Sequence, residues 1–254
     1  MTIQFYDTPE NLIAGTTLKD TKQALNGNLA LHTGEDASLV IANRQVLAEA
    51  LQVDVAQFAF ANQTHSKKAY HVKSGDRGRG SLSTEDAVDD VDALYTYESN
   101  VVVGVFTADC VPVIFYDEDT GLIGAIHSGW KGTVQNIVSA TFAQIKNENP
   151  DIYMGNIKVI LGPSIAQKSF EVDQDVADQF KGLGYADDFV QWDDKGQKYL
   201  VDNQATVAEQ LKRVGVLEDN ITVSDQDTLE MVDGFSYRLD KTLGRHFNFI
   251  TRKR

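Results

Sequence analysis

The chain has 254 residues, of which 37 are acidic and 23 are lysine or arginine, and its formal net charge is −14. This excess of acid excludes recognition of nucleic acid through a basic surface, and no apolar stretch approaches the ~20 residues needed to cross a membrane. An anionic ligand such as phosphate would therefore need a local basic pocket.

The cysteine content and the N-terminus indicate the cellular compartment. Cys110 is the one cysteine of the chain, so no internal disulfide can form, which fits a reducing cytoplasm. The first residues lack a basic segment followed by an apolar one, and we expect no secretory signal. Because no linker or internal repeat divides the sequence, we expect a single domain over residues 1–254, located in the cytoplasm.

Apolar spacing and turn residues predict helices and strands in mixed order. Residues 36–51 are expected to form a helix, since apolar residues follow helical spacing and Asp36 or Ser38 can cap its start. Residues 57–62 are expected to form a strand, and the polar, glycine-bearing segment 73–90 is expected to be a mobile loop, functional or disordered. Later in the chain we expect helices at 132–147, 171–180 and 203–214 and strands at 156–161, 221–224 and 247–251.

The fold class follows from this order. Strands and helices mix without strict alternation, so we expect a mixed-sheet α/β sandwich rather than a doubly wound parallel sheet.

Two apolar runs at 111–116 and 122–126 flank turn-forming residues and predict a β-hairpin. If Tyr116 pairs with Gly121 around a four-residue loop, Cys110 lies directly opposite His127, with Cβ atoms ~5 Å apart. Such a pair suits two ligands of one metal ion, or a thiol and its base. A register shifted by one residue would place the two side chains on opposite faces of the sheet.

His65 follows the predicted strand at 57–62 and is a candidate third ligand. Two histidines and one cysteine leave one coordination position open, as is typical of catalytic zinc, and zinc would deprotonate the thiol and lower the pKa of a bound water. The alternatives are ordinary ones: Cys110 as a small buried apolar side chain, His127 as a core histidine, and His65 as a structural or exposed residue.

Three further histidines are weaker candidates for a metal ligand. His71 competes with His65 for the third position but has no glycine turn near it. His32 and His246 lack acidic or thiol neighbours in sequence, and we assign neither to the site.

The residues that follow the predicted hairpin include positively charged side chains that could bind an anion. The glycine-flanked segment 128–132 permits a tight turn from His127 into the helix expected at 132–147, and a helix N-terminus beside Lys131 would suit a phosphate group. The alternative is that segment 128–132 only connects the strand to the helix and that Trp130 fills space in the core. Arg238 and Arg245 offer further positive charge, although exposed arginines are usually only solvated.

Taken together, the short motifs of the chain resemble those of the laccase-domain family, whose members are catalogued as polyphenol oxidases and as purine nucleoside phosphorylases. The resemblance extends from about residue 13 to residue 245, and its most specific block runs from TADC at 107–110 to HSGWKG at 127–132. The supporting motifs are NQTH at 62–65, DAL at 92–94, GPSI at 162–165 and FSYR at 235–238. One departure is Asp227-Thr228, where the family usually has Cys-Thr.

The resemblance implies a single-domain α/β fold with a zinc site at His65, Cys110 and His127. It also implies phosphorolysis of adenosine, inosine, guanosine and methylthioadenosine, together with deamination of adenosine, so the partners would be purine nucleosides and phosphate. We expect Lys131, and after it Arg238, to bind the anion. The fold is also similar to the catalytic domain of cytotoxic necrotising toxins, which deamidate glutamine with a Cys–His pair.

Two other functions stay open, and a third is excluded. The chain could be a metal-free Cys–His hydrolase or deamidase, or a peptidoglycan-editing partner that keeps zinc for structure. Multicopper oxidation needs many histidines, usually in His-x-His pairs, whereas this chain has five histidines and no such pair. Copper is the second candidate metal for the predicted zinc site.

Overall fold

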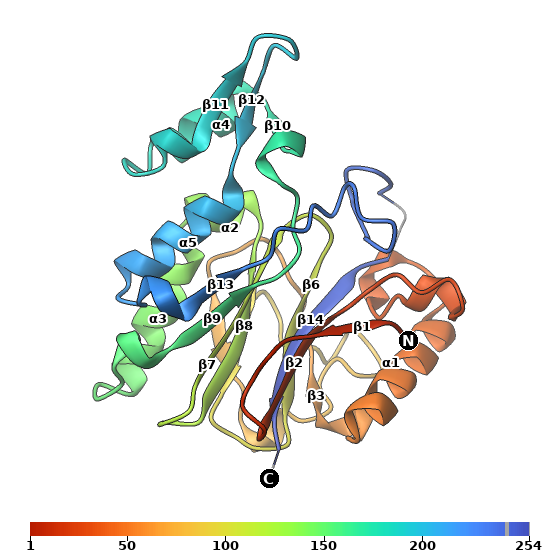
Figure 1. Ribbon diagram of the computed structural model, residues 1–254. Helices are drawn as coiled ribbons and strands as arrows, with labels where there is room; N and C mark the ends of the chain where they lie inside the picture. Colours follow the sequence, from red (N-terminus) through yellow and green to blue (C-terminus); the bar gives the residue numbers. More distant parts are fainter. Residues whose placement is uncertain (242–243, 254) are drawn as a thin grey trace.

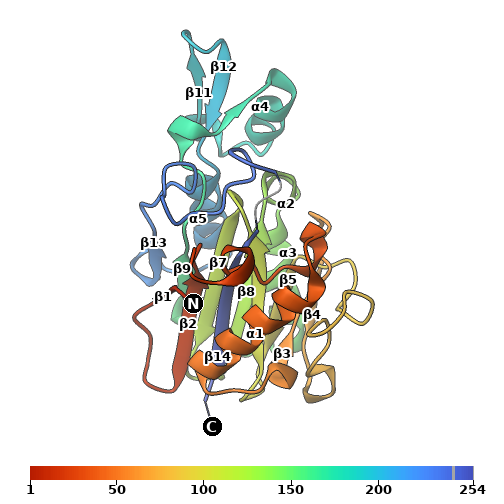
Figure 2. The ribbon, with the colours of Figure 1, turned by 90° about the vertical axis from the view of Figure 1, so that its right-hand side faces the viewer.

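Two mixed β-sheets lie face to face at the centre of the protein (Figures 1 and 2). The computed structural model describes residues 1–241 and 244–253. The strands of the first sheet, in spatial order, are β1 (Ile3–Phe5), β2 (Leu12–Thr17), β14 (His246–Arg252), β6 (Val102–Thr107) and β3 (Phe58–Ala59). Those of the second are β13 (Ile221–Val223), β9 (Lys158–Leu161), β7 (Val111–Asp117), β8 (Leu122–Ser128), β5 (Ala93–Thr96) and β4 (Ala69–His71).

Three apolar layers hold these sheets and the helices together. Branched side chains such as Val103, Ile250 and Ile114 fill the space between the sheets. Helix α1 (Ala37–Leu51) covers the outer face of the first sheet. Helices α3 (Ile137–Glu148) and α5 (Asn203–Arg213) cover the outer face of the second. The predicted fold class, a mixed-sheet α/β sandwich, is confirmed.

A smaller unit projects from one end of the sandwich (Figures 1 and 2). It consists of β10 (Glu171–Val172), β11 (Val190–Asp193), β12 (Lys198–Val201) and α4 (Gln174–Lys181). Its small apolar core contacts Trp130 and Val134, the two ends of the short helix α2 (Trp130–Val134). Among the described residues, no helix combines the length and apolar character needed to span a membrane.

Most predicted helices are present, with two corrections. Helix α1 begins where expected, and the Asp36 carboxylate caps it by accepting the N–H of Ser38. The helix expected at 132–147 is wrong as one element: α2 begins at Trp130, and the chain breaks before α3 because Asn136 takes a left-handed conformation with φ of 59°. The helix expected at 171–180 is wrong at its start, where β10 precedes α4.

The strand predictions differ mainly in length. The strand expected at 57–62 is reduced to the two residues of β3. The segment 73–90 is not a free loop, since the Gly78 N–H donates to the Phe58 carbonyl and the Arg79 carbonyl accepts the Phe60 N–H. Strands β1, β2, β4, β5 and β10 and the β11–β12 hairpin were not predicted from the sequence.

We predict that Gly124→Ala destabilises the fold. A Cβ at this position in β8 would lie 2.2 Å from Cζ of the buried Phe115, and overpacking of this kind costs about 1–3 kcal/mol. Gly75→Ala is the control, since its added Cβ would meet nothing within 4 Å, and its effect should stay within about 0.5 kcal/mol. Urea unfolding measures both, and equal stabilities of the two variants would contradict the prediction.

Candidate active site

Four strand ends meet at one edge of the second sheet. Strand β8 ends there at Ser128, and its antiparallel partners β7 and β5 begin there. Strand β4 runs parallel to β5 and begins at the same edge. The residues that precede or end these strands, His65, Asp92, Cys110 and His127, are therefore brought together although they are far apart in sequence.

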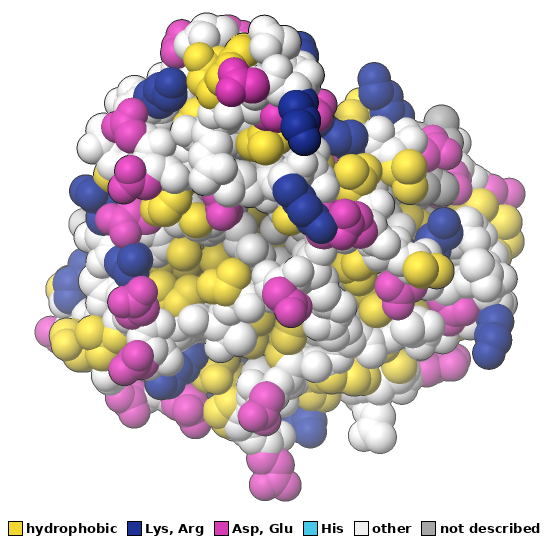
Figure 3. Space-filling model, turned by 45° about the horizontal axis from the view of Figure 1, so that its top comes forward, with side chains coloured by type: hydrophobic (Ala, Val, Ile, Leu, Met, Phe, Trp, Pro, Cys, Tyr) yellow, Lys and Arg dark blue, Asp and Glu magenta, His cyan; other side chains and the backbone are white. Residues whose placement is uncertain are grey.

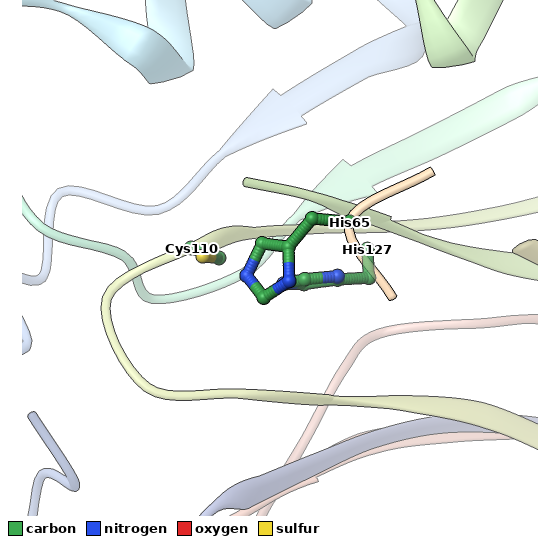
Figure 4. Close-up of side chains that lie close together, drawn as sticks. All are labelled: His65, Cys110 and His127. Carbon is green, nitrogen blue, oxygen red and sulfur yellow. The ribbon is translucent and has the colours of Figure 1, made fainter. Parts of the chain in front are cut away.

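His65, Cys110 and His127 form one cluster at this edge (Figure 4). One ligand atom from each lies within 4.8 Å of the others, and the two imidazole rings meet edge to face with 4.8 Å between centroids. His127 is buried, Cys110 is half-buried and His65 is exposed. The cluster is thus open to a ligand on the His65 side.

The hairpin register differs from the expected one. Asp117 pairs with Leu122 and Pro112 pairs with His127, so Cys110 does not lie directly opposite His127. The predicted pairing of Tyr116 with Gly121 is wrong by two residues. Because side chains alternate faces with a period of two, this shift leaves Cys110 and His127 on the same face, which is why they still meet.

Asp92 holds the cluster in place, although sequence reasoning gave it no role beyond a motif match. Its side chain is fully buried. One carboxylate oxygen accepts the His127 Nδ1–H at 2.8 Å and the His65 N–H at 3.1 Å. The other oxygen accepts the N–H groups of Thr64 at 3.2 Å and Ser66 at 2.6 Å. In the turn that makes these bonds, His65 has a left-handed backbone with φ of 60°.

The charges of the cluster are strongly coupled. Burial raises the pKa of the Cys110 thiol, but His127 and His65 outweigh it and lower that pKa to about 6. Burial lowers the pKa of His127, but Cys110 and Asp92 raise it to about 10. Without a metal the pair therefore favours a thiolate beside an imidazolium, and the thiolate is the form of cysteine that binds metals.

Gly129 leaves space beside the three donors. A Cβ there would lie 2.9 Å from Cys110 Sγ, 3.1 Å from His65 Cδ2 and 3.5 Å from His127 Nε2. Any larger residue would fill the position that these atoms share. Two imidazole nitrogens and one thiolate form a donor set that zinc accepts, with a fourth position left for a ligand. The residues present therefore fit a single metal ion.

A cavity of about 380 Å³ adjoins the cluster, within the range of about 300–1,000 Å³ that is usual for small-molecule sites. Lys131 lines it, as does Arg245, whereas Arg238 does not. The Arg238 guanidinium instead donates to the Glu171 carbonyl at 2.9 Å. The remaining lining residues are His32, Gln63, His65, Phe106, Thr107, Ala108, Cys110, His127, Trp130 and Tyr237.

The other histidines lie outside the cluster of His65, Cys110 and His127. His71 contacts Glu148 through its Nδ1 at 2.6 Å and stacks on Tyr95. His246 is fully buried, and backbone groups occupy both of its ring nitrogens. His32, to which the sequence analysis gave no role, lines the cavity.

Two further acids shape the loops around the site. Asp109, with φ of 83°, accepts the Thr228 hydroxyl and the Arg238 N–H, each at 2.8 Å. Asp227, at the position where the resembling family usually has cysteine, is buried and accepts the Ser169 hydroxyl at 2.6 Å. Both residues tie separate loops together. No spacing rule in the sequence could have identified these partners.

We predict that Asp92→Asn weakens the metal-free fold in a pH-dependent way. Burial raises the pKa of this carboxyl, but His127 and the Ser66 N–H outweigh it and lower the pKa from 3.8 to about 2. At about 1.4 kcal/mol per pKa unit, the carboxylate stabilises the fold by roughly 2 kcal/mol at neutral pH. That stabilisation is fully present above the unfolded pKa and is lost as pH falls from about 4 to about 2.

Urea unfolding in the presence of a chelator, repeated from about pH 2 to pH 7, measures this difference. The difference in free energy of unfolding between wild type and Asp92→Asn should be largest at neutral pH and should decrease below pH ~4. Asp151→Asn, which removes an exposed carboxylate, is the control. A gap that does not change with pH would contradict the prediction.

The chain matches known proteins over most of its length. Residues 19–253 match the family described as "Multi-copper polyphenol oxidoreductase laccase". The chain is 32% identical to the purine nucleoside phosphorylase YlmD of Bacillus subtilis, over 96% of this chain and 90% of that protein. It is 34% identical to adenosine deaminase RL5 from an unknown prokaryotic organism, over 92% of this chain and 90% of that protein.

Solved structures have the same fold. The hypothetical protein YfiH of Bacillus licheniformis superposes with a TM-score of 0.89 at 30% identity, covering 95% of this chain and 93% of that one. YlmD of Geobacillus stearothermophilus superposes with a TM-score of 0.88 at 31% identity, covering 96% and 93%. The chain therefore belongs to the multi-copper polyphenol oxidoreductase laccase family.

Proposed function

We propose that this protein is a zinc-dependent purine nucleoside phosphorylase that also deaminates adenosine. Relatives that match nearly the whole chain carry the names purine nucleoside phosphorylase and adenosine deaminase. The observation that carries the proposal is the convergence of His65, Cys110 and His127 on the wall of a cavity large enough for a small molecule. Adenosine is the first proposed substrate, followed by inosine, guanosine and methylthioadenosine.

We assign the zinc to His65, Cys110 and His127, with copper as the less favoured metal. When bound, zinc supplies a Lewis acid and lowers the pKa of a coordinated water to about 7. The "multi-copper" part of the family name does not suit this chain. Among the residues described, a single cluster offers three such donors, and the five histidines of the sequence include no His-x-His pair.

The chain's own side chains provide binding and orientation. Asp92 fixes the His127 ring by accepting its Nδ1–H, so Nε2 faces the other donors. The rings of Trp130 and Tyr237 line the cavity and offer surfaces on which a purine can stack. Lys131 brings positive charge to the same cavity, and it is our proposed contact for the phosphate. Arg238, the second residue predicted from the sequence, does not line this cavity.

We further propose that the chain works as one domain in the cytoplasm, where its single cysteine would stay reduced. Substrates would be small molecules, without a nucleic-acid or membrane partner.

A second function has one observation in its favour. Cys110, His127 and Asp92 follow the order of a nucleophile, its base and the acid that orients the base. A metal-free Cys–His hydrolase or deamidase would use the same three residues. Metal content and thiol reactivity distinguish the two functions.

Adenosine incubated with zinc-loaded protein and phosphate should yield adenine and ribose 1-phosphate, with some inosine or hypoxanthine. Without phosphate, only the deaminated product should form. His127→Ala should abolish both reactions, because it removes a ligand and the group that Asp92 orients, whereas His71→Ala should not. Mass spectrometry identifies the products. If zinc-loaded wild type turns over no purine nucleoside at any phosphate concentration, the enzyme proposal fails.

Metal analysis should find about one zinc per chain, and Cys110→Ser should lose most of it because a serine hydroxyl is not a thiolate donor. In the zinc-loaded wild type, Cys110 should resist iodoacetamide, and chelation should expose it to alkylation. A full metal complement in the variant would place the zinc elsewhere. Rapid alkylation without any chelator would favour the hydrolase.

A further inference from the structure

The cavity beside the metal cluster has an unusual charge for this protein. The chain carries 37 acidic side chains and a net charge of −14, and acidic and basic groups are interspersed over the face shown in Figure 3. None of the described residues that line the cavity is acidic, while Lys131 and Arg245 both line it. A cavity with this lining favours an anion that the rest of the surface repels.

Arg245 is positioned to act inside the cavity. It directly precedes β14, and its backbone N–H donates to the buried Asn28 side chain at 3.0 Å, which fixes the start of the strand. Its guanidinium donates through Nη1 to the Gly244 carbonyl at 3.0 Å, and the guanidinium carbon lies 5.4 Å from the centroid of the Tyr237 ring. Burial lowers the pKa of Arg245 more than Tyr237, Cys110 and nearby acids raise it. A partly desolvated cation attracts an anion more strongly than one in water.

His32 adds a neutral imidazole ring to the cavity lining. Burial, followed by the charge of Arg245, lowers the pKa of His32 to about 4. The ring is therefore neutral at pH 7 and can serve as a hydrogen-bonding group. On the other side, Lys131 Nζ lies 5.6 Å from the centroid of the Trp130 ring. The cavity thus carries two cations, each beside an aromatic ring.

Arg238 lacks this placement. Its guanidinium donates to the Glu171 carbonyl and lies 5.5 Å from the centroid of the Phe170 ring, and its backbone N–H donates to Asp109. The residue ties the smaller β10–β12 unit to the loop before β7 and does not itself line the cavity.

We propose that Arg245 and Lys131 form the phosphate subsite of this cavity, and that Arg245 rather than Arg238 is the arginine that binds the phosphate. The proposal rests on the proposed function. In that reaction a phosphate oxygen forms a bond to C1′ of the ribose while the C1′–N9 bond breaks. The bonding pair leaves with the purine, which takes up one proton from solvent, and ribose 1-phosphate remains. Arg245 and Lys131 offset the charge of the attacking anion.

The test compares Arg245→Gln with Arg238→Gln, and uses Arg213→Gln as the matched control. Arg213 pairs with Glu209 on α5, at 2.9 Å and outside the cavity. We expect Arg245→Gln to raise the KM for phosphate by about tenfold or more, the loss typical of one charge-assisted hydrogen bond. Arg245→Lys should restore part of the affinity, and the two other variants should resemble wild type.

Two further measurements separate the loss of phosphate binding from a loss of folding or of the metal. Zinc content and the thermal unfolding midpoint should be unchanged in Arg245→Gln, which shows that the variant folds and retains its metal site. Calorimetric titration with inorganic phosphate should detect binding to wild type and its loss in the variant. Because this binding needs no turnover, it tests the subsite even if wild type shows no phosphorolysis, in which case only the proposed function fails.

Adenosine 5′-monophosphate tests whether the two cations bind the phosphate of a nucleotide or inorganic phosphate. If the two cations instead bound a 5′-phosphate, the nucleotide would be deaminated in preference to adenosine, and inorganic phosphate would compete with it. That result would overturn the proposal. It would also be overturned if Arg245→Gln kept the wild-type KM and titration, or if Arg238→Gln showed the larger loss.

Discussion

The buried carboxylate of Asp92 is the interaction on which the site depends. It has no exposed surface, and a charge in such a place must be compensated by hydrogen bonds or by an opposite charge. The His127 imidazole and three successive backbone N–H groups provide that compensation. The same bonds fix which nitrogen of His127 faces the site and where His65 lies, so one acid positions two of the three donors.

The edge of the second sheet provides the rest of the geometry. Cys110 directly precedes β7 and His127 lies near the end of β8, and the ladder between these two strands is continuous from Asp117 to Val111. Donors on paired strands are held more firmly than donors on free loops. His65 comes instead from an exposed turn that Asp92 anchors. A rigid pair and one accessible donor around the space left by Gly129 suit a metal that exchanges its remaining ligand.

The family name and the residues point to different chemistry. A multicopper oxidase moves electrons among several copper ions, whereas the described part of this chain offers one three-donor cluster beside a cavity lined by aromatic rings and two cations. That lining matches a ligand with a flat base and an anion. The names of the relatives, purine nucleoside phosphorylase and adenosine deaminase, agree with the residues better than the name of the family does.

Local signals in the sequence predicted the features that depend on near neighbours. The cap and spacing of α1 are contained in its own residues, and the two-residue period of a hairpin was enough to bring Cys110 and His127 to one face despite the wrong register. The break at Asn136 was missed because a left-handed residue in an otherwise helical pattern leaves no mark in apolar spacing. Strands β1 and β10–β12 were missed because they are short and only partly buried.

By itself, the sequence determined the chemistry of the donors, the excess of negative charge and the class of fold. The tertiary structure decided which groups meet. Asp92 lies 27 residues from its partner His65 and 35 from His127, and Arg245 follows Lys131 by more than a hundred residues. No periodicity connects positions so far apart. They share a site only because strands packed in the two sheets end at the same edge, and long-range packing of that kind is a property of the folded chain.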